Sequence, residues 1–164
     1  MPEIWRAFHS VAGTHLYEGR ARVICGQGAL AWIVAGIFRF PPASDDTLVR
    51  VELRRAGQSE HWTRHFGASR FASVLRPAQP GYFRERFGAF EFLVRLTGDE
   101  TYLGMEVERG WFLGLPVPRF LCPHSHVREE VRDGRFQFDV EIAHPACGRI
   151  VRYQGWLAPV QAQG

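Results

Sequence analysis

Lysine is missing from this chain of 164 residues, whose 20 basic residues are all arginines. Arginine keeps its charge wherever it lies, and its planar guanidinium pairs with carboxylates and phosphates through two hydrogen bonds. A nucleic-acid-binding protein collects basic residues on one face. Here they are scattered and interleaved with glutamates, as in residues 84–86 and 128–130. With a formal net charge of +3, the pattern predicts a solvated surface and no nucleic-acid partner.

Cysteines are few, and the three present, Cys25, Cys122 and Cys147, follow no CxxC spacing. An odd set of this kind does not fit the disulfide framework of a small secreted protein. The first residues contain no basic leader followed by an apolar core, so no secretory signal is predicted. The longest apolar run, residues 29–38, is about half the length of a membrane-spanning helix. We therefore expect one soluble, cytoplasmic domain over residues 1–164.

Short segments in which hydrophobic and polar residues alternate dominate the chain, and this period is typical of strands with one buried face. In one of them Val49, Val51 and Leu53 alternate with charged residues. Between two others, Asp133-Gly134 is the dipeptide favoured in a two-residue type I′ turn. These segments predict about nine or ten strands, at residues 16–24, 47–55, 60–66, 70–76, 82–87, 90–97, 102–109, 127–132, 135–142 and 149–157.

Residues 26–40 break this alternation, because apolar side chains would cover every side of a helix formed there. A surface helix carries a polar stripe, so a helix without one is covered by the protein or lies against another apolar surface. Pro41 and Pro42 end it, since neither can donate a helical hydrogen bond. We therefore expect one buried helix near the N-terminus.

No helices alternate with the predicted strands, so a doubly wound parallel sheet is not expected. Ile4, Trp5 and Phe8 predict only a further short helix at the start of the chain. A sheet of this many strands must curl or close to protect its edges. The predicted fold is mainly β: an antiparallel β-barrel or strongly curved sheet of about nine or ten strands, with one buried helix near the N-terminus. A two-layer sandwich is the alternative.

Arg64 is the most informative charged residue, because it shares one face of its predicted strand with Trp62 and Phe66. If that face is interior, Arg64 is a buried charge that must be paired. Glu85, or another inward carboxylate such as Glu18, is the expected partner. A buried arginine beside aromatic rings can anchor a ligand carboxylate or phosphate. The alternative is a purely structural ion pair, or an exposed arginine over Trp62.

The apolar helix and a second apolar segment, residues 110–121, together predict an enclosed site. Prolines interrupt the second segment, so it is not a central strand, and we expect a lid or rim over a barrel mouth. Trp32 and Trp111 are the residues of these two segments expected to contact a ligand. Alternatively, residues 29–38 contact a membrane surface or a partner protein.

Soft metal ligands also occur near the end of the chain: Cys122, His124, His126, His144 and Cys147. A tetrahedral zinc site needs four such ligands. No pair here has a standard zinc-site spacing, and Pro123 and Pro145 mark both stretches as loops or strand ends. We expect no metal and no cofactor, and the sequence leaves open whether these five residues come together.

The combined patterns predict a binding protein without enzymatic activity, and no residue is assigned a catalytic role. Its expected ligand is a small hydrophobic or amphiphilic molecule with an acidic or polar head, contacted by Arg64, Trp62, Phe66, Glu85, Trp32 and Trp111. The second hypothesis is an enzyme that uses His65, His126 or Glu85 in a polar cleft. The third is an interaction domain that docks by its apolar helix.

Three blocks of residues, spread over most of the chain, carry a family resemblance. The first comprises Phe8-His9-Ser10, Tyr17-Glu18-Gly19-Arg20-Ala21 and Phe40-Pro41-Pro42-Ala43. The second comprises Glu60-His61-Trp62-Thr63-Arg64-His65-Phe66-Gly67, Arg70-Phe71 and Glu85-Arg86-Phe87-Gly88. The third comprises Gly114-Leu115-Pro116-Val117-Pro118, Asp133-Gly134-Arg135-Phe136-Gln137-Phe138-Asp139-Val140 and Val151-Arg152-Tyr153-Gln154-Gly155-Trp156-Leu157.

Together these blocks resemble a bacterial domain-of-unknown-function family, number 4166 (DUF4166). Its members occur alone or appended to membrane or dehydrogenase-like segments. The resemblance implies a single domain and a bacterial origin. It imports no catalytic residue, because the family has no assigned activity.

Overall fold

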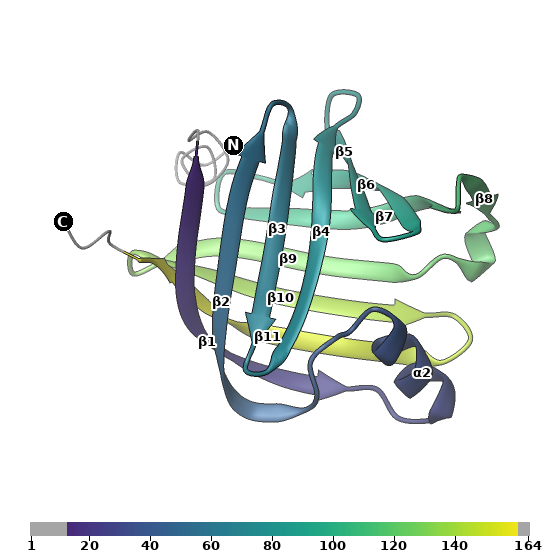
Figure 1. Ribbon diagram of the computed structural model, residues 1–164, viewed down its shortest axis with the longest axis horizontal. Helices are drawn as coiled ribbons and strands as arrows, with labels where there is room; N and C mark the ends of the chain where they lie inside the picture. Colours follow the sequence, from purple (N-terminus) through teal and green to yellow (C-terminus); the bar gives the residue numbers. More distant parts are fainter. Residues whose placement is uncertain (1–12, 161–164) are drawn as a thin grey trace.

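Ten antiparallel strands close into a barrel in the computed structural model, which describes residues 13–160 (Figure 1). They are β1 (Thr14–Cys25), β2 (Ser44–Ala56), β3 (Ser59–Phe66), β4 (Ser69–Pro77), β5 (Tyr82–Phe87), β6 (Phe90–Gly98), β7 (Tyr102–Phe112), β9 (His124–Arg132), β10 (Arg135–His144) and β11 (Gly148–Pro159). An additional short strand, β8 (Leu115–Val117), pairs with β7 alone.

Strands β1 to β7 each pair with the next strand along the chain. Strand β7 then pairs with β9, and β9, β10 and β11 follow in order until β11 pairs with β1 and closes the ring. Every pairing is antiparallel, as hairpin connections require. The closed ring confirms the predicted β-barrel and rules out the two-layer sandwich, and closure leaves no long edge that could pair with another chain.

The hairpin between β9 and β10 has the turn that the sequence predicts. Asp133 and Gly134 both adopt positive φ angles, 54° and 71°, between the paired residues Arg132 and Arg135. A type I′ turn needs this left-handed conformation at both central positions, which glycine adopts freely and aspartate tolerates. This turn sets the register of β10, in which Phe136, Phe138, Val140 and Ile142 face the barrel interior.

The alternating residues of β2 show how the pattern becomes a core. Val49, Val51 and Leu53 are 0%, 4% and 5% exposed, while the charged residues between them are exposed. They pack with inward side chains of β1, β3, β4, β10 and β11 into one hydrophobic cluster. Each buried side chain of this size contributes about 1.5–3 kcal/mol. The core therefore concentrates on this part of the wall, and several of its side chains also line an interior cavity.

The expectation of a buried helix is wrong. Helix α2 (Ala29–Ile37) is shorter than the predicted segment, and Ala31 is its one buried residue, whereas Trp32 is 78% exposed. The helix packs on β11 at the rim of the barrel, as Figure 1 shows, so one side meets protein and the other solvent. Only Val34 and Ile37 of α2, with Phe38 after it, reach the interior.

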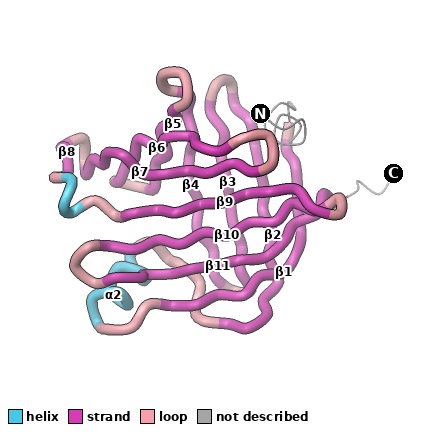
Figure 2. The backbone as a smooth tube through the Cα atoms, turned by 180° about the vertical axis from the view of Figure 1, so that it is seen from behind, coloured by secondary structure: helices cyan, strands magenta, loops and turns pink. Residues whose placement is uncertain are grey.

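The segment over residues 110–121, expected as a lid or rim, is partly strand. Its first residues extend β7 to Phe112, and β8 then forms an edge strand that contains Pro116. Proline is tolerated there because an edge strand leaves one side of its backbone unpaired. A 3₁₀ turn, η1 (Arg119–Leu121), leads on to β9. Figure 2 shows α2 and β8 at the same end of the barrel and the β9–β10 turn at the other end.

The short helix predicted from Ile4, Trp5 and Phe8 lies outside the described residues. Among residues 13–160, no helix has the length and apolar character needed to cross a bilayer.

Candidate ligand-binding site

A cavity of about 550 Å³ occupies the barrel interior. Its lining is mostly hydrophobic, and it extends from the α2 end to the opposite end, where Arg55, Gln58, Glu60 and Arg76 contribute polar atoms. Pockets that hold small molecules have volumes of about 300–1,000 Å³ and mostly apolar walls. At the α2 end the wall is aromatic: Phe38, Phe87 and Phe90 lie together, with the Phe38 and Phe90 ring centroids 5.0 Å apart.

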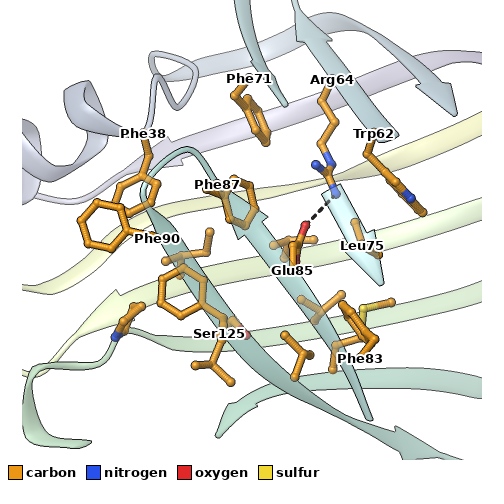
Figure 3. A pocket seen from close by; sticks show the side chains of 18 of the residues that line it. Phe38, Trp62, Arg64, Phe71, Leu75, Phe83, Glu85, Phe87, Phe90 and Ser125 are labelled. Carbon is orange, nitrogen blue, oxygen red and sulfur yellow. Dashed lines mark hydrogen bonds and ion pairs between the residues drawn. The ribbon is translucent and has the colours of Figure 1, made fainter. Parts of the chain in front are cut away.

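An ionic cluster interrupts the apolar wall between these two ends (Figure 3). Arg64 Nη1 donates a hydrogen bond to Ser73 Oγ at 2.9 Å, and Arg64 Nη2 lies 3.4 Å from Glu85 Oε1. The Ser73 hydroxyl in turn donates to Glu85 Oε1 at 2.7 Å. Serine therefore joins the two charged groups into a closed triangle, which holds the guanidinium and the carboxylate in one arrangement.

The register of three neighbouring strands brings these residues together. Arg64 on β3 is opposite Phe71 on β4, and two residues further along β4 comes Ser73, on the same face. Strand β4 in turn places Leu75 opposite Glu85 on β5. Arg64, Ser73 and Glu85 all occupy inward-facing positions of their strands. The cluster therefore follows from the alternation along each strand and from the pairing between neighbouring strands.

The cluster is mostly removed from solvent. The side chains of Arg64 and Glu85 are 15% and 17% exposed, and Ser73 is 3% exposed. The Arg64 guanidinium also lies 4.9 Å from the Trp62 ring centroid and 5.5 Å from that of Phe71. Cation–π contacts of this kind stabilise a charge that has lost water. Arg64 is thus held by Ser73 and two aromatic rings, with Glu85 as its ion-pair partner.

Tyr153, on β11, and Glu129, on β9, are further polar residues buried in the interior. Burial, the largest cause, raises the pKa of the Tyr153 hydroxyl to about 12, with Arg64 opposing the shift and Glu85 and Glu129 adding to it. The phenol therefore stays protonated across the physiological range. Its ring packs on Phe66, with centroids 5.0 Å apart. The interior hence offers a permanent hydroxyl group beside the ionic cluster.

The structure brings together four of the six residues predicted to bind a ligand. Trp62, Arg64, Phe66 and Glu85 all line the cavity. Arg64 has Glu85 as its partner, as expected from its burial. The other candidate, Glu18, pairs with Arg50 at a more exposed position. Whether these residues bind a ligand stays a prediction.

Trp32 and Trp111 are not in the cavity lining. Trp32 extends from the solvent side of α2. Trp111 follows the buried Gly110 on β7, so its side chain faces the outside of the barrel. There the Arg84 guanidinium lies 4.7 Å from its ring centroid. Neither ring is in position to contact a ligand inside the barrel, because alternation and the helix position direct both away from it.

The residues of the enzyme hypothesis are dispersed. Glu85 lies inside the barrel, whereas His65 lies between the inward residues Arg64 and Phe66 and so faces outward. His126 is exposed on the outer face of β9. General acid–base catalysis needs such groups within hydrogen-bond reach of one substrate. The barrel wall separates these three side chains, so they do not form a common cleft.

Two of the five candidate metal ligands near the end of the chain, Cys122 and His144, have other contacts. Cys122 is buried, with its Sγ 3.7 Å from the Val117 carbonyl oxygen. His144 Nε2 lies 2.8 Å from the Leu121 carbonyl, and its Nδ1 accepts a hydrogen bond from the Ala146 amide. Within the part of the chain that the structure describes, no three histidine, cysteine or carboxylate groups are arranged to hold a metal ion.

Sequence reasoning missed Ser73 and Tyr153. The signal for Ser73 was present, since it alternates with Phe71 and Leu75 on a predicted strand, and a serine at an inward position needs a polar partner. Tyr153 likewise alternates with Val151. What no pattern indicates is that β11 and β3 bring Tyr153 and Arg64 into the same interior, since the two residues are far apart in the chain.

Comparison with known proteins gives a family and a distant structural likeness. The family model described as "Domain of unknown function (DUF4166)" matches residues 1–157. No curated protein matches the chain. A solved structure titled "REP1-NXSQ fatty acid transporter" is similar to it with a TM-score of 0.46 and 13% sequence identity, over 94% of this chain and 99% of that one.

Proposed function

Because the chain belongs to the DUF4166 family, a domain of unknown function, we infer its role from its own interior and propose that it binds an amphiphilic, lipid-like small molecule without chemical conversion. One observation carries the proposal: a cavity of about 550 Å³ with a mostly hydrophobic wall contains the buried Arg64–Ser73–Glu85 cluster. A pocket of this kind matches a molecule that is largely apolar and has one polar group.

The apolar part of the ligand would lie toward the α2 end. Phe38, Phe87 and Phe90 line the cavity there, with Val117 and Leu121 from β8 and η1. Burial of a hydrocarbon chain among such side chains contributes about 0.8 kcal/mol for each methylene group. Most of the affinity therefore comes from the length of the chain, and the polar cluster orients the ligand.

The polar head would be a neutral group such as an alcohol, ketone or ester. Arg64 is already paired with Glu85, so a ligand carboxylate would either displace Glu85 or lie beside it as a second buried anion. Either outcome leaves a buried charge without its partner, which is strongly unfavourable. A hydroxyl or carbonyl oxygen can instead accept from Arg64, and a hydroxyl can donate to Glu85, without adding charge.

Native mass spectrometry of gently purified protein tests whether any such molecule is carried. An additional mass of lipid size, released by denaturation, is the expected result. Titration of delipidated protein with tetradecanol, followed by the fluorescence of tryptophan, then tests direct binding, because Trp62 lies in the cavity wall. The absence of both a co-purified mass and saturable, stoichiometric tetradecanol binding would refute the proposed function.

Comparison of tetradecanol with tetradecanoate, the ionised acid, tests the nature of the head group. We expect tetradecanol to bind at least about tenfold more tightly, a difference of about 1.4 kcal/mol. The two ligands have equal chain lengths, so their apolar burial is matched. Tighter binding of tetradecanoate would contradict a neutral head while leaving amphiphile binding in place.

A further inference from the structure

Exposed hydrophobic side chains gather at one end of the barrel. Six of them form what we call the rim patch: Trp32, Ile33 and Ile37 on α2, and Leu113, Leu115 and Phe120 around β8 and η1. Their exposed fractions run from 50% for Ile33 to 78% for Trp32. Large exposed apolar patches of this kind mark sites of interaction with proteins or membranes.

The two halves of the rim patch flank the α2 end of the cavity. Val34, Ile37 and Phe38 reach the cavity from the helix side, and Val117 and Leu121 reach it from the β8 and η1 side. Figure 2 shows α2 and β8 on either side of this end of the barrel. The patch therefore lies beside the α2 end of the cavity.

Positive charge accompanies the rim patch. Arg39 follows α2, Arg119 begins η1, and both are exposed and form no ion pair with any residue in 13–160. Neither segment, residues 26–43 or residues 109–124, contains an aspartate or glutamate. These two segments are thus apolar with basic residues at their margins, which is the composition of interfacial membrane-binding elements.

We propose that the rim patch docks on the surface of an anionic lipid bilayer, with the α2 end of the cavity facing the lipid. Tryptophan and arginine are favourable at this depth, because the indole ring and the guanidinium stem span the boundary between acyl chains and head groups. A symmetric dimer through the same patch would bring Arg39 and Arg119 of two copies close together, and like charges oppose such contact. Charge complementarity therefore favours the bilayer.

This orientation extends the proposed ligand binding but is tested without any ligand. Purified protein is sedimented with vesicles of phosphatidylcholine alone or of phosphatidylcholine mixed with phosphatidylglycerol. We expect binding to the mixed vesicles, with a blue shift of tryptophan emission from Trp32. Binding should weaken severalfold from about 0.1 M to about 1 M salt, since the Debye length falls from about 10 Å to about 3 Å.

Variants assign the binding to the rim. Trp32→Asp, and separately Arg39→Gln with Arg119→Gln, should each lower partition into the mixed vesicles about tenfold or more. Matched controls lie at the opposite end: Val160→Asp for the apolar change and Arg132→Gln for the charge change should retain binding. Glu85→Gln, inside the barrel, should also retain it. Circular dichroism confirms that each variant is folded.

Three results would overturn the proposal: no partition of the folded wild-type protein, equal partition of the Trp32→Asp variant, or a dimer at micromolar concentration that Trp32→Asp dissociates. The dimer would assign the rim patch to a second copy of the chain. Failure of tetradecanol binding, in contrast, would affect the cavity alone, because vesicle sedimentation does not require an occupied barrel.

Discussion

Replacement of Glu85 by glutamine tests the interior cluster most directly. Glutamine has nearly the same shape, and its amide oxygen can still accept the hydrogen bond of Ser73. What disappears is the negative charge 3.4 Å from the Arg64 guanidinium. Arg64 then remains a buried cation, 15% exposed, that has lost its ion-pair partner.

The expected cost follows from this separation. Two unit charges 3.4 Å apart interact by about 5 kcal/mol at an effective dielectric constant of about 20. Loss of one partner of a buried pair costs about 3–5 kcal/mol in measured cases. The cost of Glu85→Gln should lie near the lower end of this range, because the site is still partly exposed and glutamine keeps the hydrogen bond to Ser73. We expect the free energy of unfolding to fall by about 3 kcal/mol.

Urea unfolding, followed by circular dichroism and by tryptophan fluorescence, measures this change. The Arg64→Met variant should be destabilised similarly, because it leaves the carboxylate unpaired. In the double variant neither charge remains without a partner. Its free energy of unfolding should therefore fall by at least about 2 kcal/mol less than the two single decreases added together. Additive losses, within about 0.5 kcal/mol, would show that the two groups are not coupled and would refute the reasoning.

The same substitution should remove most or all of the preference for a neutral ligand head. In Glu85→Gln an Arg64 without its ion-pair partner becomes available to a carboxylate, so the affinity for tetradecanoate should rise about tenfold or more, while that for tetradecanol changes little. Unchanged tetradecanoate affinity in a folded Glu85→Gln variant would show that the ligand head does not reach Arg64.

Three further predictions concern single residues of the interior. Burial raises the pKa of Tyr153 from its ordinary 10.0 to about 12, so the tyrosine of the unfolded chain ionises at lower pH than that of the folded protein. The free energy of unfolding should therefore fall between pH 10 and 12, by about 3 kcal/mol in total from this group. Tyr153→Phe should remove this part of the alkaline loss, measured by urea titrations at several pH values. Ser73→Ala should cost about 1–3 kcal/mol of stability, because both Arg64 and Glu85 lose a hydrogen-bond partner; a neutral result would show that the hydroxyl contributes nothing. Val127→Trp should fill part of the cavity and lower tetradecanol affinity at least about tenfold, whereas His126→Trp, at the neighbouring outward position, should leave affinity unchanged.

Much of the wall of this barrel was predictable from the chain alone. Strict alternation, as in Val49, Val51 and Leu53, determines which side chains are buried, because successive residues of a strand face opposite sides. It also placed Arg64 on one face with Trp62 and Phe66. If that face is interior, the buried charge needs an acidic partner, and Glu85, or another inward carboxylate such as Glu18, was the expected one. These inferences depend only on neighbouring residues within one strand, so they do not require knowledge of which other strands it pairs with.

Only the tertiary structure decided the contents of the interior and the position of the helix. Pairing of β11 with β1 closes the ring and brings Tyr153 near Arg64, and such long-range pairing leaves no periodic trace in the sequence. The composition of an apolar helix is compatible with a position inside a barrel and with one at its rim. Here aromatic and aliphatic side chains of the strands leave a cavity while α2 packs on the rim, so Trp32 faces outward. Alternation along the sequence determines on which face of its strand a side chain lies. Closure of the sheet determines which other side chains that face contacts.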